Sequence, residues 1–224
     1  MYRPVLFGKL MDLCPKDYFK NKEILEIGPK DGRDSERLSS LQPSKLTMVD
    51  LPEKRDLVDT WLEKITCPKE YIEANFMYSS LFEPDRFSLI WCTGVLYHNA
   101  EQLRMLRKFY HLLKPDGYLV IESAVTRNQK SSDAMSDVPS VEINYPETYR
   151  QTTTVTHLPN EKAINAWLLM SGFEDVHASD CYNAFNSDLI GQRYAAISRK
   201  KKKIGSTYFH KSNKNPLYYL GDSL

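Results

Sequence analysis

The sequence predicts an α/β fold in which a doubly wound, mostly parallel sheet carries helices on both faces. Two observations lead to this prediction. Short apolar runs that end at a polar residue or a glycine alternate along the chain with segments of helical periodicity, and this alternation is typical of βαβ units. The run Tyr118–Glu122 is apolar up to its last residue, as expected for a strand that is buried on both faces of a parallel sheet.

The helices and strands are expected in a regular order. The range Phe7–Cys14 is amphipathic and predicts a short helix, and Glu101–Leu113 has apolar residues at a helical spacing before Pro115 and Gly117 stop it. Asn160 is a suitable N-cap for the last helix. Besides Tyr118–Glu122, strands are expected at 23–28, 45–51, 71–76, 87–91, 174–179 and 193–199, and further helices at 35–41, 56–65 and 160–171. Seven strands in this arrangement predict a Rossmann-like sheet.

The chain of 224 residues is expected to form a single domain, 1–224. Residues 126–156 lack a clear periodicity and are rich in Ser, Thr, Asp and Tyr. A loop of this length is uncommon in a compact domain unless it is functional, so we expect it to cover the substrate. The tail 204–224 holds four aromatic residues. We expect the tail to pack on this domain or on a partner subunit, as in a homodimer.

The composition excludes several classes of protein. The net charge of +1 gives no general attraction to nucleic acid or membranes. No apolar run approaches the roughly 20 residues of a membrane span, and the N-terminal apolar stretch is too short for a secretory signal. The four cysteines lie far apart with no C-x-x-C pair, so we expect reduced thiols, no zinc site and a cytoplasmic location. The basic run 199–203 is interpreted first as a solvated strand end and second as a phosphate contact.

The most informative motif lies at residues 24–32, where an apolar run reaches Glu26 and then Gly28 and Gly32. This pattern predicts a strand that turns sharply into a helix, with the acid at the edge where doubly wound sheets bind ligands. It is not the dinucleotide fingerprint, which needs G-x-G-x-x-G. Alone, the motif is compatible with a nucleotide, a methyl donor or a turn without a ligand.

Asp50 and the stretch Trp91–Asn99 add to this motif. Asp50 ends the second strand 22 residues after Gly28, the place of a carboxylate that accepts ribose hydroxyls; an ordinary strand-end aspartate is the alternative. At the end of the fourth strand, small residues such as Thr93 permit a ligand to approach, and Tyr97 and His98 follow. A lone histidine is more often structural, and no second histidine stands at a ligand spacing, so we expect no metal.

The segment 94–98, followed by a helix and the strand ending at Glu122, resembles the second half of class I S-adenosylmethionine-dependent methyltransferases. Residues 23–177 are similar to the subgroup that contains the tRNA wobble-uridine carboxymethyltransferase, and the later stretch from Tyr149 to Phe173 matches as well. The resemblance implies that Gly28 faces the methionine end of the cofactor and that Tyr97 meets the transferred group. It also implies cofactor contacts from Glu26, Gly32, Asp50, Leu51, Phe76, Met77 and Thr93.

Three departures from the family pattern concern the loop, the adenine site and the substrate. Lys30 stands where a middle glycine is usual, and no acid follows the third strand to meet the adenine amine. The tRNA enzyme carries a sizeable region before its first motif, whereas here the motif begins at residue 24. We therefore expect the resemblance to predict the fold and the cofactor better than the substrate.

Methyl transfer from a sulfonium mainly requires positioning and the exclusion of water. The candidate catalytic residues are His98, Tyr97 and Tyr149, with His98 the best base by its ordinary pKa. Glu122 and Arg150 are candidate substrate-binding residues. Arg150 is chosen because an arginine side chain can bind a carboxylate or phosphate group through two hydrogen bonds. For Tyr149 and Arg150 an equal alternative is that they only hold the covering loop in place.

Three functions remain open from the sequence. The first is a methyltransferase that acts on a small molecule, such as a sugar, a nucleotide-linked intermediate or a natural-product precursor. The second is a methyl- or carboxymethyltransferase that modifies RNA. The third is a non-catalytic partner subunit with this fold, which the intact first motif disfavours. S-adenosylmethionine is expected as the cofactor, with S-adenosylhomocysteine as product, in preference to carboxy-S-adenosylmethionine.

Overall fold

The structure is a computed structural model that describes residues 3–54, 58–126, 138–146, 154–178 and 193–201. Its helices are α1 (Arg3–Leu13), α2 (Arg33–Ser39), α4 (Gln102–Leu112) and α5 (Glu161–Met170), with 3-10 turns η1 (Pro52–Lys54), η2 (Leu62–Lys64), η3 (Phe76–Tyr78) and η4 (Leu96–His98). Its strands are β1 (Glu23–Ile27), β2 (Lys45–Asp50), β3 (Lys69–Glu73), β4 (Phe87–Thr93), β5 (Leu113–Ala124), β6 (Val141–Asn144), β7 (Thr156–Pro159), β8 (Phe173–Ala178) and β9 (Arg193–Lys200).

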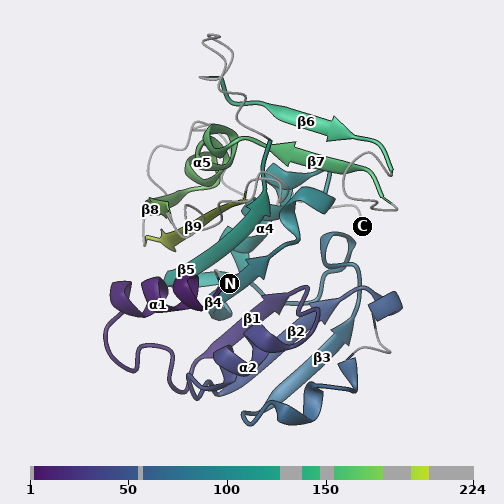
Figure 1. Cartoon of the computed structure of the whole chain (residues 1–224). Coiled ribbons are helices and arrows are strands. Elements are labelled where there is room, and N and C mark those ends of the chain that lie inside the picture. The colour runs from purple at the N-terminus through teal and green to yellow at the C-terminus, as the bar shows by residue number, and fades with distance from the viewer. Residues whose placement is uncertain (1–2, 55–57, 127–137, 147–153, 179–192, 202–224) are drawn as a thin grey trace.

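The described strands form a seven-stranded sheet of order β3-β2-β1-β4-β5-β9-β8 and a separate pair, β6-β7. Strands β3, β2, β1, β4 and β5 pair in parallel, whereas β9 runs antiparallel to both of its neighbours. The sheet fans across the molecule in Figure 1, and the β6-β7 pair lies beyond the end of β5. The predicted doubly wound, Rossmann-like, mostly parallel sheet is confirmed.

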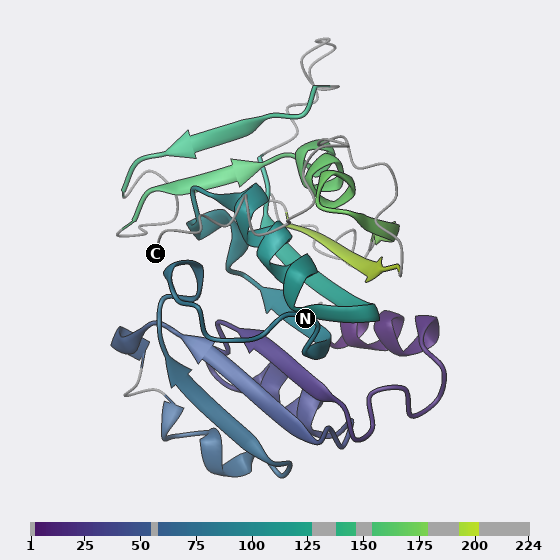
Figure 2. The ribbon, with the colours of Figure 1, turned by 180° about the vertical axis from the view of Figure 1, so that it is seen from behind.

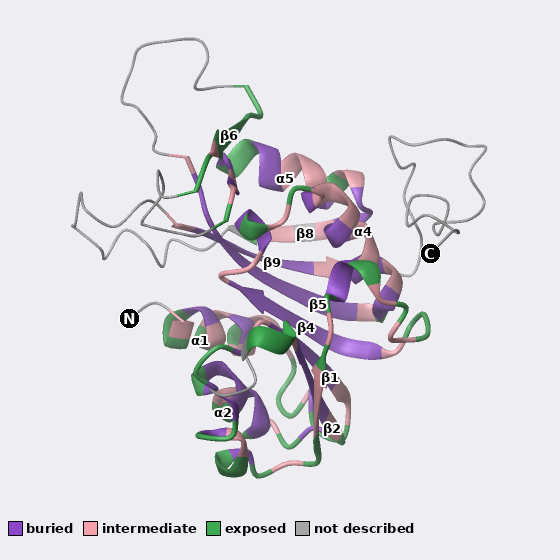
Figure 3. Ribbon diagram, turned by 90° about the vertical axis from the view of Figure 1, so that its right-hand side faces the viewer, coloured by how far each residue is buried: buried purple, intermediate pink, exposed green. Residues whose placement is uncertain are grey.

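Helices cover the two faces of this sheet. Figure 1 shows α2 in front of β1 and β2, and the reverse view in Figure 2 shows α4 in front. Successive strand residues point to opposite faces, so Ile24 and Trp91 pack with α1 and α2, whereas Leu25 and Cys92 pack with α4 and α5. The central strands are therefore buried on both sides (Figure 3).

Several boundaries differ from the prediction. Strand β3 begins at Lys69 and ends at Glu73. These bounds differ from the prediction because the residues are at most half-buried and carry no apolar run that would mark the strand in the sequence. Strand β6 lies within the range 126–156 predicted as a loop, and it pairs antiparallel with β7, which begins at the last residue of that range. In the range expected to be helical after Asp56, the structure shows the short turn η2, and residues 55–57 lie outside the described chain. The tail 204–224 also lies outside it.

Asn160 caps α5 as predicted, because its side chain accepts a hydrogen bond from the Ala163 amide at 2.8 Å. Among the described helices, none has the length and apolar character needed to cross a bilayer.

Candidate functional site

The candidate site lies at the carboxyl ends of β1, β2 and β4. Strand β1 pairs with β2 on one side and with β4 on the other, so the strand order reverses at this point. Open α/β sheets bind their ligands outside the carboxyl ends of the strands at such a reversal. The fold brings four predicted site residues to this edge. They are Glu26 in β1, Gly28 in the turn after β1, Asp50 at the end of β2 and Thr93 at the end of β4.

The turn after β1 needs glycine at two positions. Gly28 and Gly32 have φ angles of +69° and +72°, which residues with a side chain rarely adopt. A Cβ on Gly28 would lie 2.5 Å from Val95 Cγ2, and one on Gly32 would lie 2.3 Å from the ring of Trp61. The backbone therefore turns in direct contact with side chains from other parts of the fold.

Lys30 stands where the family pattern usually has a glycine, and it adopts the left-handed conformation that favours glycine. Its φ is +52°, and Trp61 Nε1 donates a hydrogen bond to its carbonyl oxygen at 3.1 Å. The left-handed conformation costs a non-glycine residue about 1 kcal/mol. The hydrogen bond from Trp61 holds the loop in this conformation.

Glu26 is buried at the end of β1. Ser35, on the first turn of α2, donates a hydrogen bond from Oγ to Glu26 Oε2 at 2.5 Å. Burial, opposed by the hydrogen bond from Ser35 and reinforced by the nearby charge of Asp34, raises the pKa of Glu26 to about 8. The carboxyl group is therefore held protonated in the folded protein at neutral pH.

The raised pKa of Glu26 predicts a pH-dependent stability. The unfolded chain releases this proton near its ordinary pKa of 4.5, whereas the folded chain keeps it up to about 8. The folded state binds more protons in this window, so the contribution of Glu26 is full below pH 4.5 and is lost as the pH rises through 8. As the pH rises from about 5 to about 8.5, we expect the free energy of unfolding, measured in urea, to fall less for Glu26→Gln than for the wild type. Parallel losses in the two proteins would contradict this.

Asp34, on α2, is the buried centre of the site's hydrogen bonds, and the sequence analysis missed it. Its side chain is 1% exposed. Oδ2 accepts from Arg3 Nη1 at 2.9 Å, from Trp91 Nε1 at 3.2 Å and from Thr93 Oγ1 at 3.1 Å. Oδ1 pairs with Arg37 Nη1 at 2.9 Å. The carboxylate thus ties α1, α2 and β4 together, and the hydroxyl of Thr93, predicted to line the cofactor, is oriented by it.

Arg3 brings a positive charge to the same edge. It lies on the first turn of α1, and its Nη2 is 3.2 Å from the position that a Cβ on Gly94 would occupy. Glu122 Oε2 lies 3.8 Å from the same position. Gly94 follows β4 directly and has a φ of +77°. The guanidinium therefore stands over the end of the central strand.

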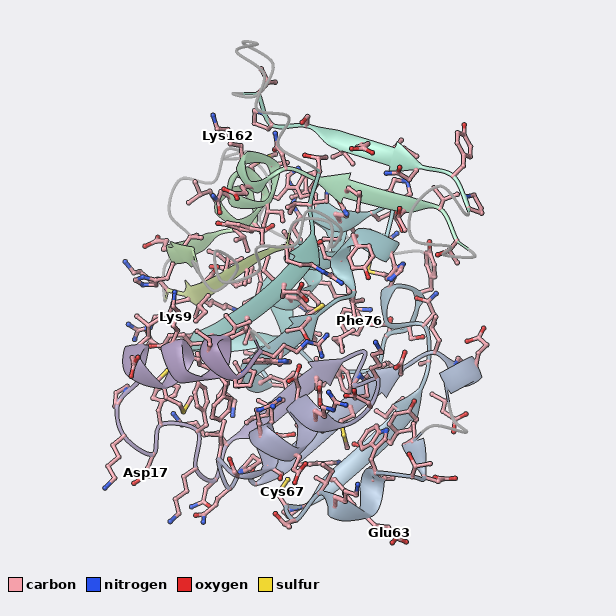
Figure 4. The ribbon with its side chains drawn as sticks, viewed as in Figure 1. Lys9, Asp17, Glu63, Cys67, Phe76 and Lys162 are labelled. Carbon is pink, nitrogen blue, oxygen red and sulfur yellow. The ribbon has the colours of Figure 1, made fainter. Side chains whose placement is uncertain are left out.

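The residues predicted to surround ribose and adenine follow β2 and β3. Asp50 Oδ1 accepts a hydrogen bond from the Leu51 amide at 2.8 Å, and the side chain of Leu51 is exposed. Phe76 and Met77 are buried on the turn η3. Phe76 lies near the middle of the molecule (Figure 4) and stacks on Phe109, with ring centroids 5.3 Å apart. The adenine contacts expected of Phe76 and Met77 stay a prediction.

The predicted catalytic residues lie on η4, beside the ends of β5 and β9. The Tyr97 ring is buried, the His98 ring is exposed, and their centroids are 4.0 Å apart. Glu122 is fully buried and forms an ion pair with Arg193, whose Nη1 lies 3.2 Å from its Oε1. The guanidinium of Arg193 also lies over the Tyr97 ring, at 5.1 Å from its centroid. Tyr149 and Arg150 lie outside the described residues.

The arrangement suits a cofactor with a ribose and an amino-acid end that carries a carboxylate. Residues 2–178 match the methyltransferase domain family. The chain belongs to this family. It is a class I S-adenosylmethionine-dependent methyltransferase related to the subgroup that the sequence resembles.

Comparisons with individual proteins agree with this methyltransferase assignment. The chain is 23% identical over 202 residues to the tRNA U34 carboxymethyltransferase of Nautilia profundicola, covering 88% of this chain and 58% of the relative. It is 27% identical over 170 residues to the enzyme of the same name from Wolinella succinogenes, covering 74% of this chain and 54% of the relative. The chain thus spans a little over half the length of these relatives.

A solved structure shows the same fold. The 1,6-didemethyltoxoflavin-N1-methyltransferase of Burkholderia thailandensis, with bound S-adenosylhomocysteine, superposes with a TM-score of 0.59 at 19% identity. The match covers 89% of this chain and 78% of that one. At this identity the likeness supports the fold.

Proposed function

We propose that this methyltransferase transfers a one-carbon group from an S-adenosylmethionine-type donor to RNA. The observation that carries the proposal is the match to two tRNA U34 carboxymethyltransferases, one of them over 88% of this chain. The sequence analysis favoured a small-molecule acceptor and kept RNA as the alternative. The names of these relatives favour the RNA alternative.

The methyltransferase residues fit the cofactor. S-adenosylmethionine supplies the electrophilic carbon, and the protein positions the two reactants and excludes water. Asp50, at the end of β2, is placed to accept ribose hydroxyls. The glycine turn after β1 and Thr93 border the methionine end, and Arg3 supplies a cation there.

The acceptor side is formed by η4 and the ends of β5 and β9. The Arg193 guanidinium lies over the ring of Tyr97, and Tyr97 belongs to a small buried cluster with Ala124 and Leu158 of β7. The exposed His98 is the candidate general base for a hydroxyl acceptor. The charge of Arg193, beside Tyr97, is already paired with Glu122 and so does not decide between donors with and without a carboxylate. The donor assay therefore includes carboxy-S-adenosylmethionine.

The decisive experiment is a transfer assay with donors labelled in the transferred carbon. S-adenosylmethionine and carboxy-S-adenosylmethionine are each incubated with the purified protein and unmodified tRNA, or with a pool of small-molecule acceptors. The proposal expects label in the nucleosides released by digestion of the RNA. Label in the small-molecule pool with unlabelled RNA would overturn it and restore the first reading from the sequence.

The position of Arg3 predicts which end of the cofactor it holds. If the guanidinium meets the methionine carboxylate, Arg3→Met removes a charge-assisted hydrogen bond worth about 1.5–3 kcal/mol, and affinity for S-adenosylhomocysteine falls about tenfold or more. Affinity for 5′-methylthioadenosine, which lacks that carboxylate, should stay unchanged. Calorimetric titration measures both, and Arg37→Met is the matched control because it also removes a partner of Asp34. Equal losses for the two ligands would show that Arg3 only supports the fold.

A further inference from the structure

The side chain of Trp61 contacts two residues of the turn that follows β1. Its Nε1 donates a hydrogen bond to the carbonyl oxygen of Lys30 at 3.1 Å. Its ring packs directly on Gly32, since a Cβ added to that glycine would lie 2.3 Å from the nearest ring carbons. Trp61 belongs to the segment between β2 and β3. It therefore reaches the turn from a different part of the chain.

Trp61 is itself held firmly. It is 5% exposed, and it belongs to the cluster of buried residues that includes Leu6 of α1 and Leu38 of α2. Its amide donates a hydrogen bond to the carbonyl oxygen of Val58 at 3.0 Å, and its own carbonyl oxygen accepts one from the amide of Lys64 at 3.0 Å. The indole is thus a fixed point against which the turn is held.

The turn needs a restraint at Lys30. Gly28, Lys30 and Gly32 have φ angles of +69°, +52° and +72°. A glycine adopts this conformation without a steric cost, whereas the Cβ of a lysine disfavours it. A residue in a sparsely populated conformation persists only where its surroundings determine that conformation. The hydrogen bond from Trp61 to the carbonyl oxygen of Lys30 supplies this restraint.

The contact with Gly32 extends the restraint to α2. Gly32 is the N-cap of this helix, and its carbonyl oxygen accepts a hydrogen bond from the amide of Glu36 at 2.8 Å. The same helix carries Asp34 and also Ser35, whose Oγ donates a hydrogen bond to Glu26. Holding Gly32 in place therefore also holds the start of the helix whose side chains organise this edge of the sheet.

We propose that Trp61 is a positioning residue for the donor, because it keeps the turn 28–32 in the binding conformation that Lys30 alone disfavours. The proposal rests on the part of the proposed function in which the donor lies against this turn, and it does not depend on the acceptor. If only a fraction of the molecules holds the turn in the binding conformation, the apparent affinity for the donor falls in proportion to that fraction. Trp61 thus raises the affinity without touching the reacting atoms.

The test measures the affinity for S-adenosylhomocysteine by calorimetric titration of the wild type and four variants. Trp61→Phe keeps an aromatic ring beside Gly32 but removes the N–H donor. Lys30→Gly removes the side chain that disfavours the turn, and the double variant Lys30→Gly/Trp61→Phe combines the two changes. Trp167→Phe, at a half-buried position of α5, is the matched control for the loss of an indole. Urea unfolding of each variant establishes that it is folded under the conditions of the titration.

We expect Trp61→Phe to weaken binding about fivefold, the effect of one lost hydrogen bond, and Trp167→Phe to change it by less than about twofold. In the Lys30→Gly background, the same change at Trp61 should weaken binding by less than about twofold, because a glycine needs no restraint in this conformation.

Two results would overturn the inference and leave the proposed function standing. One is an affinity of Trp61→Phe equal to that of the wild type. The other is a loss of the same size with and without Lys30→Gly, because Trp61 would then act only through its packing in the core. Failure of the wild type to bind S-adenosylhomocysteine would overturn the placement of the donor in the proposed function as well.

Discussion

Replacing Asp34 with asparagine is expected to lower the free energy of unfolding by about 3 kcal/mol or more, the range found when one partner of a buried ion pair is removed. The carboxylate of Asp34 is 1% exposed and forms ion pairs with both Arg3 and Arg37. It also accepts hydrogen bonds from Trp91 and Thr93. An amide keeps the shape but offers only one acceptor oxygen, so two cations and two donors would share it in a buried site.

Urea unfolding of Asp34→Asn and of Asp31→Asn measures this effect. Asp31 is a matched control three residues away, because its ion pair with Arg33 is exposed and such pairs contribute about 1 kcal/mol or less. Since Arg3 is one of the groups that Asp34 holds, the variant should also bind S-adenosylhomocysteine more weakly. A loss as small as that of the Asp31 variant would show that Asp34 does not carry the network.

The elements that the sequence predicted well are those whose signal is local. Strand β1 and its turn follow from an apolar run that ends at Glu26 and Gly28, and α5 follows from its N-cap at Asn160. The hairpin was missed because β6 is only four residues long and mostly exposed, and the alternation Val-Glu-Ile-Asn is too short to indicate a strand. The position of edge strand β3 was predicted wrongly because its half-buried residues carry no apolar run.

The parts of the site that were missed depend on long-range contacts. Arg3 and Asp34 are 31 residues apart, and Asp34 and Thr93 are 59 apart. In the sequence Asp34 is one of several charged residues at a helix start, and such residues are normally solvated. Arg193 carries no motif either, and it reaches Glu122 because β9 pairs antiparallel with β5. The spacing of residues along the chain predicted the position of Asp50 at a strand end. Contacts between residues from separate segments could be identified only in the folded structure.

The largest remaining effect is expected at the buried pair of Glu122 and Arg193. Glu122 is fully buried at the end of β5, and Arg193 is mostly buried on the neighbouring strand β9. Removing one partner leaves the other as an uncompensated buried charge. Glu122→Leu should therefore lower the free energy of unfolding by about 3–5 kcal/mol.

The double variant Glu122→Leu/Arg193→Met separates the pair from the packing around it. Each charge costs stability only because the other is missing, so we expect the double variant to be more stable than the sum of the single losses predicts, by about 1–3 kcal/mol. The exposed pair of Lys201 and Glu174 is the control, and Glu174→Leu should cost about 1 kcal/mol or less. Strictly additive losses would show that the two charges do not depend on each other.

The double variant also tests function, because it keeps Tyr97 but removes the cation over its ring. If Arg193 serves the acceptor side, this variant should fold and bind S-adenosylhomocysteine yet transfer its group slowly.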